Sequence, residues 1–445
     1  MYKNTLYQST MGKPMEKSQV SFTYKPQAEN KVVNLYPKIK YQRVQGFGSA
    51  LTESSAVNYD AMPAATRAKF MKLFFDRQEG LGLNLCRTHI HSCDFSEGCY
   101  TYVEEGDKQL KTFSIAHDEK CIIPFIKDSI AACTDGLMLF CSPWSPPAFM
   151  KSNNDMLHGG KLLPEYYEAW AQYYVKYIQA YQAHGVEFFA LTVQNEAMAT
   201  QTWESCVYTA EETALFVRDY LYPQLKKAGL DTKVLIWDHN KEHVVDWVEG
   251  LHSVVGARET VAGVAFHWYS GDHFDALRMA HEIDPDLMLL ETEFCSMLCK
   301  TQEQEWKVAM RYAYEMIGNL NNYAHGMTEW NILLDQNGEP RHDADGGCGA
   351  MAHYNKDTDQ LHLSQVYYAM GHFSKFIQRG AVRLGSSKYR QDLFVTALEN
   401  PDGSIVVVLE NQGAADTIEL RLNDYAGKME LAESSITTLV IEAEK

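Results

Sequence analysis

Two stretches of this sequence share one pattern, Leu191-Thr192-Val193-Gln194-Asn195-Glu196 and Leu289-Leu290-Glu291-Thr292-Glu293-Phe294-Cys295. Each is a short apolar run that leads into polar residues and a glutamate. Apolar runs of this length are typical of buried strands. In α/β folds the carboxyl ends of such strands meet the loops that carry the chemistry. Two glutamates placed there predict one site with two carboxylates, which hydrolysis of a glycosidic bond requires.

The same kind of apolar run recurs through the middle of the chain and predicts eight strands. They are residues 46–51, 83–87, 137–141, 188–193, 233–237, 263–267, 287–290 and 326–330. Helical patterns lie between most of them, such as residues 166–183 and a stretch that opens with a capping box at Thr209 and Glu212. This alternation predicts an α/β fold, a (β/α)8 TIM barrel, over residues 45–375. A doubly wound open sheet is the alternative, but no Gly-rich phosphate loop follows the first run.

The two ends of the chain have a different, all-β pattern. After about residue 375 come apolar runs at 393–398, 404–409 and 435–441, with a turn signal at Asn400-Pro401-Asp402-Gly403. Residues 1–44 are mostly polar but hold two strand signals, at 20–24 and 32–35. We therefore expect a smaller all-β sandwich domain made by residues 376–445, which the N-terminal strands of residues 1–44 join.

Composition limits the partners. The 445 residues carry a formal net charge of −18, from 58 acidic and 40 basic residues. An acidic chain is not attracted to nucleic acid or to an anionic membrane surface, so neither is predicted as a partner. The sequence has no signal-peptide pattern and no run of 18 apolar residues, which predicts a cytoplasmic protein without a membrane anchor. The ten cysteines are irregularly spaced, so we expect reduced thiols and no metal or other cofactor.

The two glutamates take different roles in this hypothesis. Glu196 is the candidate general acid and then base, and the amide of Asn195 beside it can bind a sugar hydroxyl. Glu293 is the candidate nucleophile. Glu291 would point to the same side in a regular strand and competes for that role, although Glu293 lies nearer the strand end. A carboxyl spacing of about 5–5.5 Å would give retention of configuration, and a wider one inversion.

Several motifs also carry a resemblance to a family. They are Gln45-Gly46-Phe47-Gly48-Ser49-Ala50-Leu51-Thr52, Ser92-Cys93-Asp94-Phe95-Ser96, Ser142-Pro143-Trp144-Ser145-Pro146-Pro147, Asn195-Glu196, His267-Trp268-Tyr269, Thr292-Glu293-Phe294-Cys295, Trp330-Asn331 and Gly371-His372-Phe373-Ser374-Lys375-Phe376-Ile377. In this order they resemble the glucosylceramidase-like glycosidases of glycoside hydrolase family 30, from about residue 45 to the end.

The resemblance implies a barrel with a side β-domain, a retaining mechanism, and the roles given above for Glu196 and Glu293. It also implies a sugar pocket lined by Arg87, Asp94, Trp144, Asn195, His267, Tyr269 and Trp330. In such a pocket Asp94 would accept hydrogen bonds from sugar hydroxyls, and Arg87 would hold carboxylates in place. Tyr269 would donate a hydrogen bond to Glu293 and keep it ionised.

Two segments depart from the family pattern. Ala197-Met198 follows Glu196 where relatives commonly have proline, which leaves the geometry of that loop open. The loop after Trp330 reads Gly338-Glu339-Pro340-Arg341-His342 where relatives often place a Gly-Pro step and a tryptophan. An aromatic wall of the pocket is therefore expected to be absent or supplied by another segment.

The favoured function is an exo-acting retaining β-glycosidase that releases terminal β-linked glucose from oligosaccharides or glycosides. A β-xylosidase or an endo-β-1,6-glucanase of the same family are alternatives. A catalytically silent carbohydrate-binding protein on the same barrel is the alternative from another class, and the presence of both glutamates argues against it. A metal-dependent hydrolase is the least favoured. The sequence assigns no oligomeric state.

Overall fold

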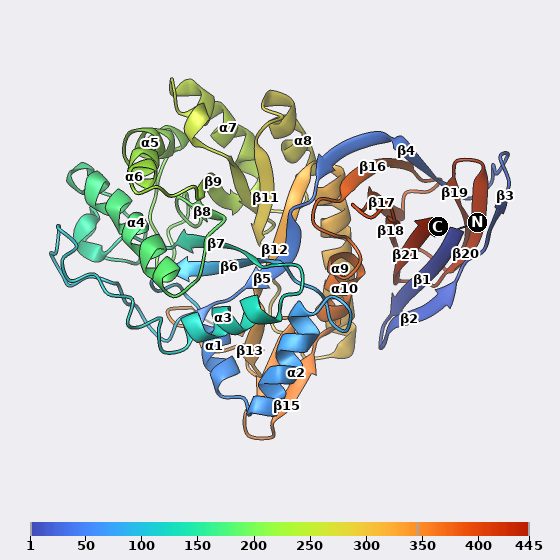
Figure 1. Ribbon diagram of the computed structural model, residues 1–445, viewed down its shortest axis with the longest axis horizontal. Helices are drawn as coiled ribbons and strands as arrows, with labels where there is room; N and C mark the ends of the chain where they lie inside the picture. The colour runs from blue at the N-terminus through green and yellow to red at the C-terminus, as the bar shows by residue number, and fades with distance from the viewer. Residues whose placement is uncertain (1, 345–346, 444–445) are drawn as a thin grey trace.

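The protein has two parts, a barrel and a smaller β-domain, which lie side by side in the computed structural model (Figure 1). The structure describes residues 2–344 and 347–443. No helix within these residues is both long and apolar enough to cross a membrane.

Eight parallel strands close the barrel, as the sequence predicts. They are β5 (Gly46–Ala50), β6 (Leu85–Ile90), β7 (Met138–Pro143), β8 (Ala190–Thr192), β9 (Lys233–Asn240), β10 (Gly263–His267), β11 (Met288–Glu293) and β12 (Ala324–Asn331). Their interior is filled by apolar side chains from successive strands, among them Leu85, Phe140, Leu235 and Leu290. Strands buried on both faces read as nearly continuous apolar runs, which is why each was visible in the sequence.

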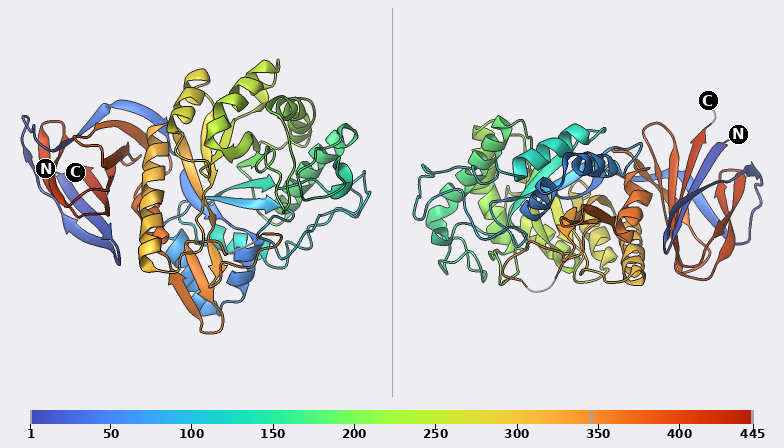
Figure 2. Two further views of the ribbon diagram at one scale, coloured as in Figure 1. Left: turned by 180° about the vertical axis from the view of Figure 1, so that it is seen from behind. Right: turned by 90° about the horizontal axis from the view of Figure 1, so that it is seen from below.

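Helices cover the outside of the barrel (Figures 1 and 2). They are α1 (Glu53–Asp60), α2 (Ala64–Phe75), α3 (Ile122–Ala132), α4 (Tyr167–Ala183), α5 (Ala210–Phe216), α6 (Tyr222–Lys227), α7 (Val244–Ser253), α8 (Phe274–Ile283), α9 (Gln302–Asn321) and α10 (Gln365–Ser374). The helix predicted over residues 166–183 is α4, and its aromatic side chains recur every three or four residues and are buried. The predicted capping box begins α5, where the Thr209 and Glu212 side chains each accept a hydrogen bond from the other's backbone N–H.

The β-domain is one ten-stranded sheet that folds around its own apolar core. The N-terminal part contributes β1 (Tyr2–Thr10), β2 (Lys13–Gln19), β3 (Phe22–Tyr24) and β4 (Val32–Arg43). The C-terminal part contributes β16 (Val382–Ser387), β17 (Leu393–Glu399), β18 (Ile405–Asn411), β19 (Asp416–Leu422), β20 (Tyr425–Leu431) and β21 (Ser435–Ala443). Strand β1 pairs with β21, so the first and last strands lie next to each other (Figures 1 and 2).

Helices α9 and α10 lie between the barrel and the β-domain (Figure 1). The imidazole of His372 on α10 is fully buried at this junction. Its Nδ1 is 2.8 Å from Oγ1 of Thr438 on β21, and its Nε2 is 2.7 Å from Oγ of Ser9 on β1. Burial lowers the pKa of His372 to about 3, so this contact is made by a neutral ring.

Candidate active site

Glu196 is the first of the two glutamates, and a sharp bend of the backbone holds it at the carboxyl end of the barrel. Strand β8 ends at Thr192, and Glu196 then adopts a left-handed φ of 49°, which is uncommon for a residue with a side chain. The backbone N–H of Glu196 donates to the Asp238 carbonyl at 2.8 Å, and its carbonyl accepts from the Ala199 N–H at 2.8 Å. These two bonds fix the backbone on both sides of Glu196.

Glu293 is the last residue of β11 and lies opposite the β8 loop. The pairing between β10 and β11 slips by one residue here, because Phe266 pairs with Glu291 and the next residue pairs with Glu293. A bulge of this kind changes which face a side chain takes. Thr292 consequently points inward and donates to Asp238 at 2.5 Å.

The same bulge corrects the expectation that Glu291 shares a side with Glu293. Glu291 is fully buried near Glu315 of α9 and Lys241, outside the barrel interior. Burial and the neighbouring Glu315 raise the pKa of Glu291 well above its ordinary value. The side chain is therefore a buried group behind the strand and does not compete for the nucleophile's place.

Arg87, at the centre of the site, connects the strand ends through its guanidinium. It donates to Oε2 of Glu293 at 2.7 Å, to Oδ1 of Asn195 at 3.0 Å and to Oδ2 of Asp238 at 2.7 Å. Arg87 and Asp238 are both fully buried, and this cation holds the pKa of Asp238 below its ordinary value against the effect of burial. The sequence pattern did not single out Asp238, although this residue directly follows the apolar run 233–237, just as other predicted site residues lie at the ends of their own runs.

Histidine and tyrosine side chains surround the two carboxylates. The Tyr269 hydroxyl donates to Oε1 of Glu293 at 2.9 Å. Nδ1 of His267 lies 3.4 Å from Oε1 of Glu196 and 4.0 Å from Oε1 of Glu293, while its Nε2 is 3.1 Å from Asp238. The separation of the two glutamate oxygens cannot exceed the sum of their distances to Nδ1. This limit admits the spacing of about 5–5.5 Å that retaining enzymes use, and only the lower part of the range of about 6.5–9.5 Å that inverting enzymes use.

Two further side chains contact Glu196 and were not predicted. Nδ1 of His239 lies 3.4 Å from its Oε1, and the Gln201 amide donates to its Oε2 at 3.0 Å. Gln201 lies on the loop after β8, where sequence spacing carries no signal. His239 comes at the end of β9, one residue after Asp238.

The charges of the site follow from burial and these neighbours. Burial alone would raise the pKa of Glu196, but the imidazoles of His239 and His267, each 3.4 Å from its Oε1, hold it below its ordinary value. The pKa of Glu293 is raised by burial, against the effect of His267 and Arg87. Burial would lower the pKa of His267, yet Glu293, Asp238 and Glu196 raise it to about 9. At neutral pH, therefore, the His267 imidazolium holds a proton beside Glu196.

A cavity of about 440 Å³ opens over the two glutamates. Trp144 and Trp330 form its floor, with ring centroids 5.2 Å apart, and the Arg87 guanidinium lies 4.7 Å from the Trp144 ring centroid. Asp94 lies in its wall, where burial and the charge of Glu293 raise the pKa of that carboxyl to about 8. The lining thus contains Asp94, Trp144, Asn195, Glu196, Tyr269, Glu293 and Trp330. Arg87 and His267 lie behind it, in contact with the glutamates.

The rest of the lining was not predicted. Phe95 and Trp203 supply aromatic side chains, so the pocket has aromatic walls without the tryptophan that relatives often have after the last strand. Cys295 and Cys348 also line the cavity, with sulfur atoms 3.5 Å apart. All ten cysteines are free thiols in the structure.

The comparison with known proteins identifies the family. Residues 44–377 match the Glycosyl hydrolase family 30 TIM-barrel domain, and residues 380–439 match the Glycosyl hydrolase family 30 beta sandwich domain. The chain belongs to glycoside hydrolase family 30 and is an O-glycoside hydrolase with a carbohydrate substrate.

Individual relatives are similar over nearly the whole chain. The lysosomal acid glucosylceramidase of Mus musculus is 32% identical over 441 residues, which are 94% of this chain and 84% of that protein. The crystal structure of SrfJ from Salmonella typhimurium is 35% identical, with a TM-score of 0.96 over 99% of this chain and 100% of that one. The endo-beta1,6-glucanase BT3312 is 27% identical, with a TM-score of 0.90 over 99% of this chain and 100% of that one.

Proposed function

We propose that this protein is a retaining β-glycosidase that releases terminal β-linked glucose, with Glu293 as nucleophile and Glu196 as acid and base. The observation that carries the proposal is that the two glutamates flank the His267 imidazole but have different hydrogen-bonding neighbours. Glu293 accepts a hydrogen bond from Arg87 at Oε2 and one from the Tyr269 hydroxyl at Oε1. Such donors stabilise the carboxylate form, which attacks first and leaves later. Glu196 lies instead beside the imidazoles of His239 and His267, and the His267 imidazolium holds a proton 3.4 Å from its carboxylate.

In the first step an oxygen of Glu293 bonds to the anomeric carbon while the bond from that carbon to the aglycone oxygen breaks. Glu196 gives a proton to this oxygen, and the aglycone departs as an alcohol. The lowered pKa of Glu196 keeps it ionised at neutral pH, so it has to gain a proton before this step. The neighbouring His267 imidazolium, 3.4 Å away, is the nearest source. Transfer of that proton would leave a neutral His267 between the protonated Glu196 and the Glu293 carboxylate.

In the second step the Glu196 carboxylate takes a proton from water, and the resulting hydroxide adds to the anomeric carbon. The bond between the anomeric carbon and Glu293 breaks, and its electron pair stays on the Glu293 carboxylate, to which Arg87 and Tyr269 donate hydrogen bonds. Two displacements at one carbon give overall retention. Trp144 and Trp330 offer apolar faces to the sugar ring, and Asp94 offers a hydrogen-bonding group to its hydroxyls.

Glucose is favoured over xylose by the relatives. The glucosylceramidase and the 1,6-glucanase described above carry glucosyl or glucan in their names, and both are more than 25% identical to this chain. Exo action is favoured by the cavity, because about 440 Å³ lies near the small end of the 300–1,000 Å³ typical of ligand pockets. A long polymer groove would be larger and more open.

Trapping with a 2-fluoro-β-glucoside tests the nucleophile. Mass spectrometry of a proteolytic digest is expected to find the sugar on Glu293, and NMR of early product is expected to find the β-anomer. Attachment to another residue would overturn the assignment. Inversion at the anomeric carbon would overturn the retaining mechanism as a whole.

Glu196→Gln tests the acid and base. This variant is expected to lose hydrolysis of substrates with poor leaving groups, while aryl glycosides with good leaving groups still form the glycosyl–enzyme, because departure of their aglycone needs little protonation. Added azide should then accelerate its turnover and yield the β-glycosyl azide. Equal loss on both kinds of substrate, without azide rescue, would contradict the role.

The endo-β-1,6-glucanase is the second candidate, and the 0.90 TM-score to BT3312 supports it. A panel of p-nitrophenyl β-glucoside, β-xyloside and β-galactoside together with β-1,6-glucan oligomers separates the readings, with Glu293→Gln as the control. Release of glucose from short substrates supports exo action. Cleavage within long oligomers alone supports the endo enzyme, and β-xyloside turnover alone supports a xylosidase. Binding without any turnover would leave a carbohydrate-binding protein.

A further inference from the structure

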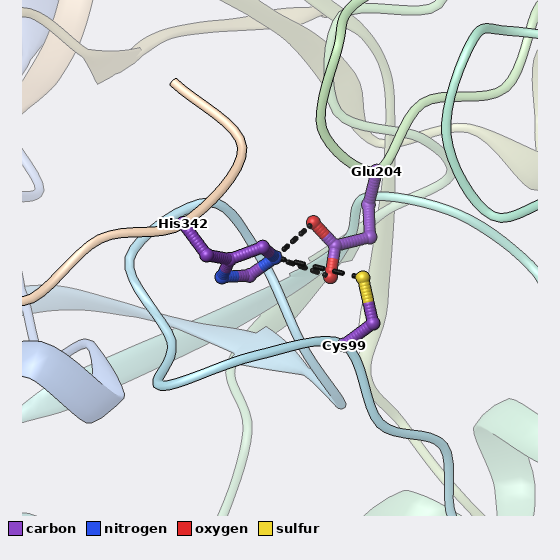
Figure 3. Close-up of side chains that lie close together, drawn as sticks. All are labelled: Cys99, Glu204 and His342. Carbon is purple, nitrogen blue, oxygen red and sulfur yellow. Dashed lines mark hydrogen bonds and ion pairs between the residues drawn. The ribbon is translucent and has the colours of Figure 1, made fainter. Parts of the chain in front are cut away.

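Three potential metal ligands meet at the rim of the sugar pocket, outside the machinery described above (Figure 3). Cys99 lies on the loop between β6 and α3, Glu204 on the loop between β8 and α5, and His342 on the loop between β13 (Leu333–Asp335) and β14 (Ala352–Asn355). Their side chains point toward one another in Figure 3. Nε2 of His342 is 3.1 and 3.2 Å from the two Glu204 oxygens and 3.6 Å from Sγ of Cys99.

The imidazole is oriented as a ligand would be. Nδ1 of His342 lies 3.0 Å from the carbonyl oxygen of Ser96, to which it donates, so Nε2 is the nitrogen that faces the other two groups. Metal-binding histidines are commonly fixed in this way by a backbone carbonyl. Glu204 is almost fully buried, whereas Cys99 is exposed, so one side of the cluster is open to an incoming ion.

The spacing fits a tetrahedral ion. Zinc bonds of about 2.3 Å to sulfur, 2.05 Å to nitrogen and 2.0 Å to oxygen place neighbouring ligands about 3.6 Å (sulfur to nitrogen) and about 3.3 Å (nitrogen to oxygen) apart. The observed 3.6 Å and 3.1–3.2 Å match these edges. Oδ2 of Asp343, 3.7 Å from the same nitrogen and half-exposed, is available as a fourth ligand.

We propose that Cys99, Glu204 and His342 bind a divalent transition metal of the zinc type, with Asp343 or water as the fourth ligand. Thiolate, imidazole and carboxylate together suit zinc, whereas magnesium and calcium take oxygen ligands alone. Binding releases the thiol proton of Cys99 and the proton that His342 holds at Nε2 in its ion pair with Glu204. The three ligands are distant in sequence, which is why their spacing gave no sign of a site.

Such an ion would join three loops that carry pocket residues. Asp94 and Cys99 lie on the first, Trp203 and Glu204 on the second, and Arg341 and His342 on the third. The backbone N–H of His342 already donates to the Asp94 carbonyl at 3.0 Å. The bound ion would therefore hold these three loops together at the pocket rim without contacting the reacting atoms.

Cobalt substitution tests the proposal directly. The full chain is reduced, stripped of metal with a chelator, and titrated with Co²⁺. One equivalent is expected to produce a thiolate-to-cobalt charge-transfer band and the intense visible bands of a tetrahedral site, and Zn²⁺ is expected to displace it. The catalytic cluster of Glu196, His239 and His267 contains no thiol, so it cannot produce the charge-transfer band.

Variants locate the site. Cys99→Ser should abolish the charge-transfer band, and His342→Gln and Glu204→Gln should weaken Zn²⁺ binding roughly tenfold or more. Cys299→Ser is the matched control, because Cys299 is also a partly accessible loop thiol, and it should keep the full signal. Near-ultraviolet circular dichroism checks the fold of each variant. A band that persists in Cys99→Ser, or the absence of stoichiometric Co²⁺ and Zn²⁺ binding to the unmodified chain, would overturn the proposal.

Discussion

Tyr269 is the most exposed of the proposed sugar-contacting residues, with 42% of its surface accessible, yet its hydroxyl reaches one oxygen of Glu293. Tyr269→Phe removes only this donor. A hydrogen bond to a charged group contributes about 1.5–3 kcal/mol, so kcat/KM should fall about 10- to 100-fold. Steady-state kinetics on an aryl glucoside measures the change. Tyr36→Phe, at an exposed tyrosine of the β-domain, is the control and should have no effect. Unchanged kinetics in Tyr269→Phe would mean that the bond does not stabilise the nucleophile.

The raised pKa of Asp94 predicts that kcat/KM falls at alkaline pH. Its pKa is raised to about 8 by burial and by the charge of Glu293, so the side chain is neutral at pH 7 and can donate to a sugar hydroxyl. Above about pH 8 it becomes an anion beside the nucleophile, and kcat/KM should fall. In Asp94→Asn the highest value of kcat/KM should be lower than in the unmodified enzyme. The pH at which kcat/KM falls should move toward the pKa of His267, about 9. Profiles of kcat/KM against pH measure both enzymes. A fall at the same pH in the variant would contradict the assignment.

At the scale of elements, the bulge in β11 decides which carboxyl enters the site. Glu291→Gln is expected to change kcat/KM by less than about threefold and stability by less than about 1 kcal/mol, because the amide has nearly the shape of the carboxyl and the side chain lies outside the pocket. Urea denaturation and kinetics measure the two quantities. Glu293→Gln, the matched change two residues later, should abolish turnover. Loss of activity in Glu291→Gln would restore the competing candidate.

Alternation along a strand could not have revealed this difference. The rule that residues i and i+2 share a face holds for a regular strand, and the extra residue at Thr292 breaks it. The positions of the barrel strands were predictable because buried parallel strands are apolar on both faces. The strands missed in the sequence lie in the β-domain and in a separate three-stranded sheet of β13, β14 and β15 (Gln360–Leu363). Strand β2, for example, is an almost fully exposed edge strand that contains two lysines and a glutamate, so it has no apolar pattern.

The site residues that lie at strand ends could be predicted from the sequence, whereas those that lie on loops could not. Glu196, Glu293 and Arg87 lie at or near the ends of apolar runs, and the structure brings them together. Asp238 lies in an equally regular place, but a carboxylate after a strand is common and nothing local distinguishes it. Gln201 and Trp203 come from a loop whose path depends on the left-handed turn at Glu196, and a turn of this kind has no sequence signature in a non-glycine residue.

At the scale of the molecule, His372 connects the two parts. His372→Ala removes the bonds to Ser9 and Thr438 and leaves a cavity, which should lower the free energy of unfolding by about 2–4 kcal/mol. Chemical denaturation measures the loss, and KM should not change because the residue lies outside the pocket. His362→Ala is the control, because His362 is largely exposed in its contact with Glu305, and it should lose less than about 1 kcal/mol. Equal losses in the two variants would contradict this account of the junction.

The pairing of β1 with β21 has a consequence for how the protein is made. Leu6 pairs with Leu439, so the two strands are separated by roughly 430 residues of chain. At about 5–20 residues per second, a ribosome delivers the partner of β1 roughly 20–90 seconds after β1 itself. During that interval the nascent barrel can close, but β1 has only β2 beside it and offers an open edge to other chains. Completion of the β-domain therefore has to wait for β21, and premature termination just before β21 would leave both β1 and β18 with an unpaired edge.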